Sequence, residues 1–215
     1  MNSSTRIHTL ALTLLSITTS ASAANLLTNS SFEAVDASAP PYYIRSFAST
    51  PGWTQFLDGV DLIHNNYTQG PAVLVHASDG VQFLDMNQAG VLGGLFQVVA
   101  ATVGNSYHLT LDTTAWATNA IGGTLGYELY DPASNTVLAS GSYTDTVGGT
   151  WISRSLNAVA ISGSIGVRIQ GLAATQAGMG LDNVVLTAVP EPGSTALLLA
   201  GLGAVGALAR RRSAS

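Results

Sequence analysis

Short runs in which apolar and polar residues alternate recur through the middle of this chain, and they constrain its fold more than any other feature. Tyr107, Leu109 and Leu111 alternate with polar residues, and residues 124–129 and 165–169 repeat the pattern. A period of two places the apolar side chains on one face of a half-buried antiparallel strand. Turn-forming pairs separate the runs: Pro40-Pro41, Pro51-Gly52, Asp79-Gly80, Gly93-Gly94, Asp131-Pro132 and Gly148-Gly149. The middle of the chain is therefore predicted to be all-β, an antiparallel sandwich of two sheets.

The composition limits how this domain is held together and what it binds. The 215 residues include no cysteine, which excludes disulfides, thiolate metal sites and a cysteine nucleophile, so the fold must depend on a hydrophobic core. All seven basic residues are arginine, and only Arg45, Arg154 and Arg168 lie in the middle, together with all but one of the twelve acidic residues. An acidic surface repels phosphate backbones, so nucleic acid is not an expected partner. Cations and neutral polymers such as polysaccharides remain compatible with it.

The N-terminal segment predicts export. A mostly apolar run over residues 9–20 follows a single basic residue, Arg6, and it is too short to span a bilayer, which needs about 20 residues. Ala21 and Ala23 supply the small residues that a signal peptidase reads. We predict a signal peptide over residues 1–23, helical before its removal and cleaved after Ala23. A buried N-terminal helix is the alternative.

The C-terminal segment predicts a second signal. Pro190-Glu191-Pro192 ends the preceding strand, because proline cannot donate to a strand ladder. An uncharged apolar run over residues 196–209 follows, a marginal membrane span by its length, and the cluster Arg210, Arg211 and Arg212 closes it. Positive charge after an apolar helix stays on the cytoplasmic side, so the domain would lie on the other side of the inner membrane.

This order of features resembles the PEP-CTERM protein-sorting signal, and the resemblance covers residues 189–215. It implies that a transmembrane helix holds the protein transiently in the inner membrane. It also implies recognition by a membrane protease of the exosortase type, which removes the tail near Pro-Glu-Pro, in Gram-negative bacteria that make exopolysaccharide. An ordinary C-terminal anchor is the alternative. Both alternatives place residues 24–188 outside the cytoplasm, at the cell surface or in the extracellular matrix.

A series of short motifs in the middle has its own family counterpart. Residues 25–33 read Asn-Leu-Leu-Thr-Asn-Ser-Ser-Phe-Glu, Pro51-Gly52-Trp53 follows, and residues 181–186 read Leu-Asp-Asn-Val-Val-Leu. The series is similar to galactose-binding-like jelly-roll modules, which include carbohydrate-binding modules, although Ser30 stands where that family usually has glycine. The resemblance spans residues 25–187 and implies a jelly-roll fold that binds carbohydrate.

The same resemblance implies a structural calcium ion between the first and last strands. Glu33 and Asp182 are the matching positions, and Asp36 or Asp79 would add a third carboxylate. Calcium takes about six to eight oxygen ligands, so backbone carbonyls and water would complete the site. The alternative is that these carboxylates accept hydrogen bonds from backbone amides.

The strand that begins near Tyr107 offers a candidate sugar-binding face. Because its odd positions are predicted to face inward, Trp116 would face outward beside His108 and Asp112. Sugar rings stack on flat aromatic surfaces, and Tyr42 and Tyr43 could add such surfaces from a loop. A bulge in the strand would instead turn Trp116 into the core.

No sequence motif for catalysis is present, and a glycosidase-like pair of Asp58 or Asp61 with Asp85 is the strongest arrangement that a hydrolase would use. We therefore predict a non-catalytic exported module that binds polysaccharide in an exopolysaccharide or biofilm matrix. A self-associating structural matrix protein without a sugar pocket is the alternative, and a glycan hydrolase is a third.

Overall fold

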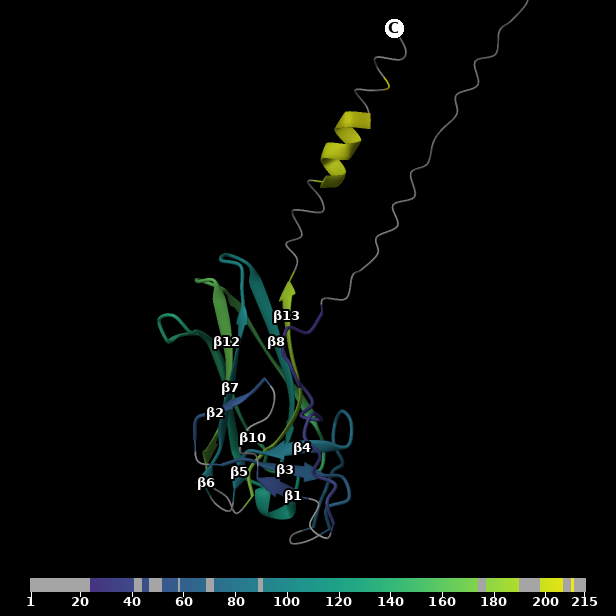
Figure 1. Cartoon of the computed structure of the whole chain (residues 1–215), viewed down its shortest axis with the longest axis vertical. Helices are drawn as coiled ribbons and strands as arrows, with labels where there is room; N and C mark the ends of the chain where they lie inside the picture. The colour runs from purple at the N-terminus through teal and green to yellow at the C-terminus, as the bar shows by residue number, and fades with distance from the viewer. Residues whose placement is uncertain are drawn as a thin grey trace, which may run out of the picture.

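Two antiparallel sheets packed face to face form the domain, as the alternation of residues predicts (Figure 1). The computed structural model describes residues 24–40, 44–46, 52–57, 59–68, 72–88, 91–173, 177–189, 198–206 and 210. The first sheet has six strands, in the order β1 (Ile44–Ser46), β3 (Asp61–His64), β4 (Gln82–Asp85), β13 (Gly180–Val189), β8 (Ser106–Thr114) and β11 (Ile152–Val159). The second sheet has five, in the order β10 (Thr136–Thr144), β9 (Thr124–Asp131), β12 (Ser164–Ala173), β7 (Gly94–Ala100) and β2 (Thr54–Gln55). A small ribbon of β5 (Asn87–Gln88) and β6 (Val91–Leu92) and the short 3-10 helix η1 (Thr118–Ala120) complete the domain.

The inward side of each long strand carries the apolar residues that the sequence pattern places there. In β8, Tyr107, Leu109 and Leu111 are buried between the sheets, while the residues between them are half-exposed. In β12 the residues at 165, 167 and 169 are buried in the same way. The prediction of a two-layer sandwich with its core between the sheets is confirmed.

The first described segment lies against the last strand. The backbone N–H of Leu26 donates to the carbonyl of Leu186 at 2.8 Å, and the N–H of Val184 donates to the carbonyl of Ser30 at 3.0 Å. The left-handed backbone conformations of this segment fall on Asn29 (φ 51°) and Phe32 (φ 61°). Serine is therefore accommodated at position 30 without that conformation, which explains why the family's usual glycine can be absent.

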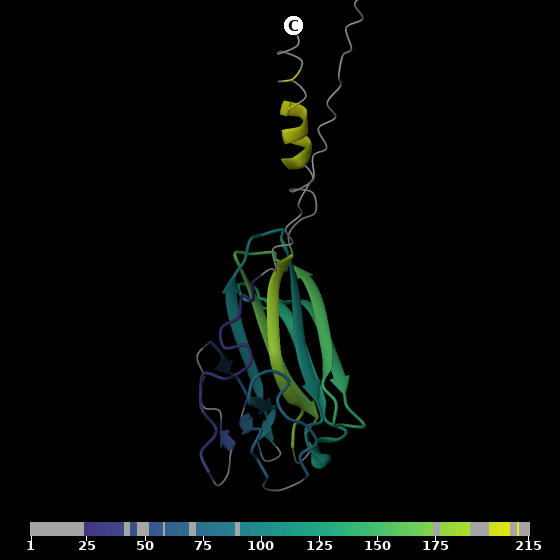
Figure 2. The ribbon, with the colours of Figure 1, turned by 90° about the vertical axis from the view of Figure 1, so that its right-hand side faces the viewer.

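The two ends of the sandwich differ in what they carry. One end is made by the loops over residues 101–105, 132–135 and 160–163 and by Val189, where β13 stops; we call it the exit end. Figure 2 shows β13, in yellow-green, running through the first sheet to this end. The opposite end carries β1, β3, η1 and the loop over residues 145–151 (Figure 1).

The described part of the C-terminal apolar run is helical over residues 198–206, and its leucines are exposed. Within the part of the chain that the structure describes, no helix has both the length and the hydropathy needed to cross a membrane. The predicted signal helix with Ala21 and Ala23 lies outside the described residues, as do Pro190, Glu191, Pro192, Arg211 and Arg212.

Candidate functional site

Trp116 does not lie on an outer face, so the prediction that it faces outward beside His108 and Asp112 is wrong. Its side chain is 2% exposed and packs between Tyr67 and Phe83, with ring centroids 5.8 Å and 5.7 Å away. The alternation of β8 stops where both Thr113 and Thr114 are buried, and the chain then leaves the strand. An indole this deeply buried presents no ring face to a ligand, because a sugar must reach the ring face to stack on it.

His108 and Asp112 do lie on the outer side of β8, but without an aromatic neighbour from position 116. His108 Nδ1 lies 2.8 Å from Asn157 Oδ1 on the neighbouring strand. Asp112 Oδ2 accepts hydrogen bonds from Ser78 Oγ at 2.5 Å and Asn183 Nδ2 at 3.1 Å. Both side chains therefore bind local partners across the first sheet. Tyr42 and Tyr43 fall outside the described residues.

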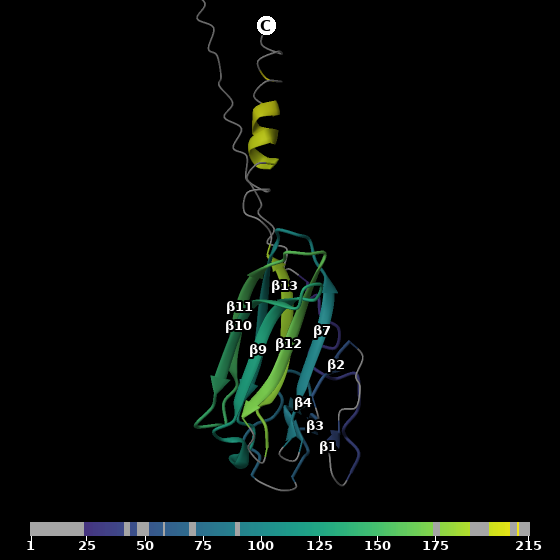
Figure 3. The ribbon, with the colours of Figure 1, turned by 90° about the vertical axis from the view of Figure 1, so that its left-hand side faces the viewer.

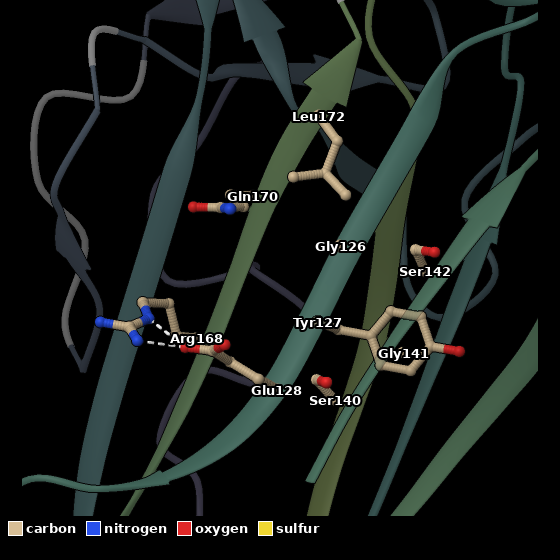
Figure 4. Close-up of a pocket in the computed structure, with 9 residues that line it drawn as sticks. All are labelled: Gly126, Tyr127, Glu128, Ser140, Gly141, Ser142, Arg168, Gln170 and Leu172. Carbon is tan, nitrogen blue, oxygen red and sulfur yellow. Dashed lines mark hydrogen bonds and ion pairs between the residues drawn. The ribbon is translucent and has the colours of Figure 1, made fainter. Parts of the chain in front are cut away.

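A shallow depression of about 390 Å³ lies on the outer face of the second sheet, which faces the viewer in Figure 3. Nine residues from three adjacent strands line it (Figure 4): Gly126, Tyr127 and Glu128 of β9, Ser140, Gly141 and Ser142 of β10, and Arg168, Gln170 and Leu172 of β12. Most of these positions are two apart in their strands, so the period of two brings them to the same face.

The strand register arranges the lining residues in two rows across the sheet. In the first row Ser140 pairs with Glu128, Glu128 pairs with Arg168, and Arg168 pairs with Phe96 of β7. The second row runs through residues 142, 126, 170 and 94. Each row therefore starts at a serine hydroxyl and crosses the depression to β7.

Two glycines in the lining have different roles. A Cβ atom at Gly126 would lie 2.8 Å from Leu172 Cδ1, and one at Gly141 would lie 2.7 Å from the Tyr127 ring. Figure 4 shows the Tyr127 ring lying across β10 at Gly141. A side chain at Gly126 would fill the floor of the depression, whereas Gly141 makes room for the ring of Tyr127, which packs in the core.

Charged groups fix the middle of the first row. Arg168 forms an ion pair with Glu128, and its Nη1 donates to Asn135 Oδ1 at 3.2 Å. The Arg168 guanidinium also lies 4.6 Å from the centre of the Tyr130 ring. Burial raises the pKa of Tyr130; the Arg168 charge lowers it and the Glu128 charge raises it. The ion pair is part-exposed, so it presents oriented donors and acceptors to solvent.

An aromatic pair borders the depression on β7. The rings of Phe56 and Phe96 are 6.3 Å apart, and a Cβ atom at Gly94 would lie 2.7 Å from Phe56 Cε1. Phe56 thus covers the end of the second row, while Phe96 ends the first. The sequence alone does not predict this site, although the alternation around residues 128 and 168 indicates that both side chains point away from the core.

The suggested carboxylate pair Asp61 and Asp85 exists as a cross-strand pair of β3 and β4. Asp85 is 5% exposed, and burial raises its pKa to about 8; hydrogen bonds from the N–H groups of Gly178 and Asn87 lower it, and the charge of Asp61 raises it. The carboxyl holds those two amides at 2.7 Å and 3.1 Å. This geometry gives Asp85 a structural role in joining segments. Asp58 lies outside the described residues.

Glu33 and Asp182 both bind the loop over residues 78–82. Glu33 Oε1 accepts the N–H groups of Val81 and Gln82 at 2.8 Å and 3.0 Å. Asp182 Oδ2 accepts the N–H of Asp79 at 2.9 Å. Both carboxylates thus accept hydrogen bonds from backbone amides, which is the alternative to a calcium site.

The described side chains include no group of three histidine or acidic residues that could hold a metal ion. Asp182 is fully buried, and burial raises its pKa to about 7, against the lowering effect of its backbone hydrogen bonds. The oxygens that face the loop accept backbone amides. Calcium stays a prediction.

The C-terminal segment matches a known family model. Residues 188–213 match the model described as PEP-CTERM protein-sorting motif. The chain carries a PEP-CTERM sorting motif. The motif implies a secreted protein with transient membrane anchoring and processing by an exosortase. No curated protein matches this chain in sequence.

The domain is similar to solved carbohydrate-binding modules. TmCBM61, solved in complex with beta-1,4-galactotriose, has a TM-score of 0.54 and 15% identity, over 77% of this PEP-CTERM chain and 99% of that chain. The CBM22-1 xylan-binding domain from Paenibacillus barcinonensis Xyn10C has a TM-score of 0.43 and 18% identity, and the match covers 69% of this chain and 94% of that chain. The enzymatically active domain of Bacteriophage CBA120 tailspike protein 4 has a TM-score of 0.47 and 16% identity, and the match covers 77% of this chain and 21% of that chain. The likeness to TmCBM61 establishes the jelly-roll sandwich fold.

Proposed function

We propose that this PEP-CTERM protein is a non-catalytic module that binds polysaccharide in an exopolysaccharide or biofilm matrix after an exosortase-type protease has removed its tail. The binding site is the depression on the second sheet. The observation that carries this assignment is the pair of cross-strand rows, in which hydroxyl, carboxylate, guanidinium and amide groups lead to two aromatic rings.

The site suits an extended sugar chain. Neighbouring strands lie about 4.8 Å apart, so the four strands from β10 to β7 span about 14 Å. A sugar ring would stack on Phe56 or Phe96, and the next units would hydrogen-bond Arg168, Glu128 and Gln170. The ion pair holds the two charged groups in place before binding, which lowers the entropic cost of ordering them.

The charges favour a neutral glycan. Glu128 compensates the charge of Arg168 within the depression, and the domain as a whole is acidic. A strongly anionic polymer would meet net repulsion at this surface, whereas a neutral polysaccharide would not.

Binding of residues 24–188 to a panel of polysaccharides, measured by calorimetry, tests the proposal. We expect Gln170→Ala and Phe96→Ala each to weaken binding about tenfold, equal to about 1.4 kcal/mol. The matched control is Thr110→Ala on the outer side of β8, which should bind like the parent. Loss of binding in Thr110→Ala and His108→Ala, with Gln170→Ala unaffected, would move the site to the first sheet. No saturable binding to any polysaccharide would overturn the proposal.

A second candidate is a structural matrix protein that self-associates. The observation in its favour is β10, an edge strand of nine residues without a charged side chain. Uncharged edges can pair between chains, because their free N–H and C=O groups accept another strand.

A further inference from the structure

The exit end carries exposed aliphatic side chains on two neighbouring loops. Val103 is 63% exposed and Ile161 is 54% exposed, and Val159 and Val189, which end β11 and β13, are also exposed. Both of those strand ends pair with Ser106, so all four side chains belong to one end of the sandwich.

Backbone hydrogen bonds hold the two loops together. Gly104 N–H donates to the Ala160 carbonyl at 2.9 Å, and Ala160 N–H donates to the Asn105 carbonyl at 3.0 Å. Ala101 N–H donates to the Gly163 carbonyl at 2.9 Å. The loops that carry positions 103 and 161 are therefore paired, and their backbones hold the aliphatic side chains in fixed positions.

Among the residues that the structure describes, the loops of the exit end carry no exposed charged side chain, although the domain is acidic. The ionisable side chain at its loops is Asp131, which is 2% exposed. Ser134 N–H donates to Asp131 Oδ2 at 2.9 Å, and the Ser162 hydroxyl donates to Oδ1. The carboxylate thus ties two loops together under the surface. The described loops of this end therefore carry no charge that an anionic bilayer would repel.

The length of the following segment limits where this end can lie. Pro190–Thr195 separate Val189 from the apolar run that starts at Ala196. At a maximum of about 3.6 Å per residue, seven residue steps span at most about 25 Å. A domain held by that run in a bilayer must therefore keep its exit end close to the lipid.

We propose that the exit end, through Val103, Ile161, Val159 and Val189, rests on the lipid surface of the membrane while the sorting tail is uncut. This rests on the transient membrane anchoring that the sorting motif implies, which precedes the removal of the tail in the proposed function. Aliphatic side chains insert at the boundary between headgroups and acyl chains, as they do in interfacial helices. The contact holds the Pro190-Glu191-Pro192 segment at the bilayer surface, within reach of a membrane-embedded protease.

Fluorescence quenching on the full chain tests this proposal. The chain has no cysteine, so single labels can be placed by Val103→Cys and Ile161→Cys. Val147→Cys is the matched control, since Val147 is a 77% exposed valine in the loop at the opposite end. Gly203→Cys reports insertion of the apolar helix. The proteins are reconstituted in vesicles of phosphatidylethanolamine and phosphatidylglycerol with a polarity-sensitive dye and lipid-borne quenchers.

We expect labels at positions 103 and 161 to shift to shorter emission wavelength and to be quenched from the lipid, and the label at 147 to show neither effect. With a label at Asn105→Cys, adding Val103→Asp and Ile161→Asp should abolish quenching while position 203 stays quenched.

Equal emission at positions 103, 161 and 147 would overturn the proposal. A shift that appears only when an exosortase-type protease is added would assign the surface to a protein partner and also overturn it. An unquenched label at position 203 would show that the apolar helix is not inserted, and it would overturn the anchoring on which the proposal rests. Polysaccharide binding by Val103→Ser with Ile161→Ser should equal the parent, which separates this result from the sugar site.

Discussion

Two buried carboxyl groups dominate the chemistry at the scale of single residues. Asp85 and Asp182 are both enclosed in the first sheet, and burial raises their pKa values to about 8 and about 7. Each accepts hydrogen bonds from backbone amides that belong to other segments. The two groups therefore join loops that the strand ladders do not hold.

Their raised pKa values predict a stability that depends on pH. An unfolded aspartate has a pKa of about 3.9, so between about pH 4 and pH 8 the folded protein holds protons that the unfolded chain has released. Stability should fall as pH rises through this range and level off above it. Asp85→Asn keeps an oxygen for the amides of Gly178 and Asn87 and should flatten the slope. Thermal midpoints at several pH values measure this; an equal slope in parent and variant would contradict the assignment to Asp85.

Calcium binding is a separate prediction at the same scale. If Glu33 and Asp182 contribute to a calcium site, added calcium should raise the thermal midpoint and a chelator should lower it, because the ion binds the folded state alone. Asp182→Asn should remove the difference between the two conditions. A midpoint that calcium and chelator leave unchanged would show that these carboxylates act only as acceptors for the loop over residues 78–82.

At the scale of elements, the sequence predicts the buried face of each strand better than it predicts where strands end and which strands pair. The alternation in β8, β9 and β12 assigns the buried face of each strand correctly. It fails at Trp116, because the chain leaves β8 after Thr114 and the tryptophan turns into the core. The depression could not be predicted, because it depends on the pairing of Glu128 with Arg168, which are far apart in the sequence and meet through the sheet order.

The depression itself can be tested by filling its floor. Gly126→Val should place a branched side chain against Leu172, an exposed residue that can turn away, so the fold should persist. Glycan affinity should fall at least about tenfold, or about 1.4 kcal/mol. Calorimetry measures affinity and circular dichroism checks folding. Gly163→Ala, where a Cβ atom would meet nothing within 4 Å, is the control. Unchanged affinity in a folded Gly126→Val variant would exclude the depression as the sugar site.

At the scale of the whole molecule, the edges of the sandwich determine whether two chains can pair. The edge strand β10 packs beside β11 of the other sheet, and the Arg154 guanidinium lies 3.6 Å from the centre of the Tyr143 ring. This contact closes one side of the sandwich and leaves the strand's own edge as the part that another chain could pair with.

Sedimentation over a concentration series distinguishes the two proposed functions. A sugar-binding module should remain a monomer at every concentration. A structural matrix protein should form larger species as concentration rises, and Ser140→Arg on β10 should suppress them, since charge on an edge strand opposes pairing. A strict monomer excludes the matrix-forming alternative, whereas concentration-dependent assembly of the parent would favour it.

The position of β13 between β4 and β8 also determines how the processed protein would respond to a pull. If the cut C-terminus is joined to another molecule, tension enters through a strand that pairs with β8 from Gly180 to Val189 and with β4 at Gly180 and Leu181. The load then runs parallel to the β13–β8 ladder, so its hydrogen bonds are stressed together in shear. The first segment, whose N-terminal side lies beside the end of β13, would instead be peeled away one bond at a time. The tail thus leaves from the mechanically stronger of the two termini.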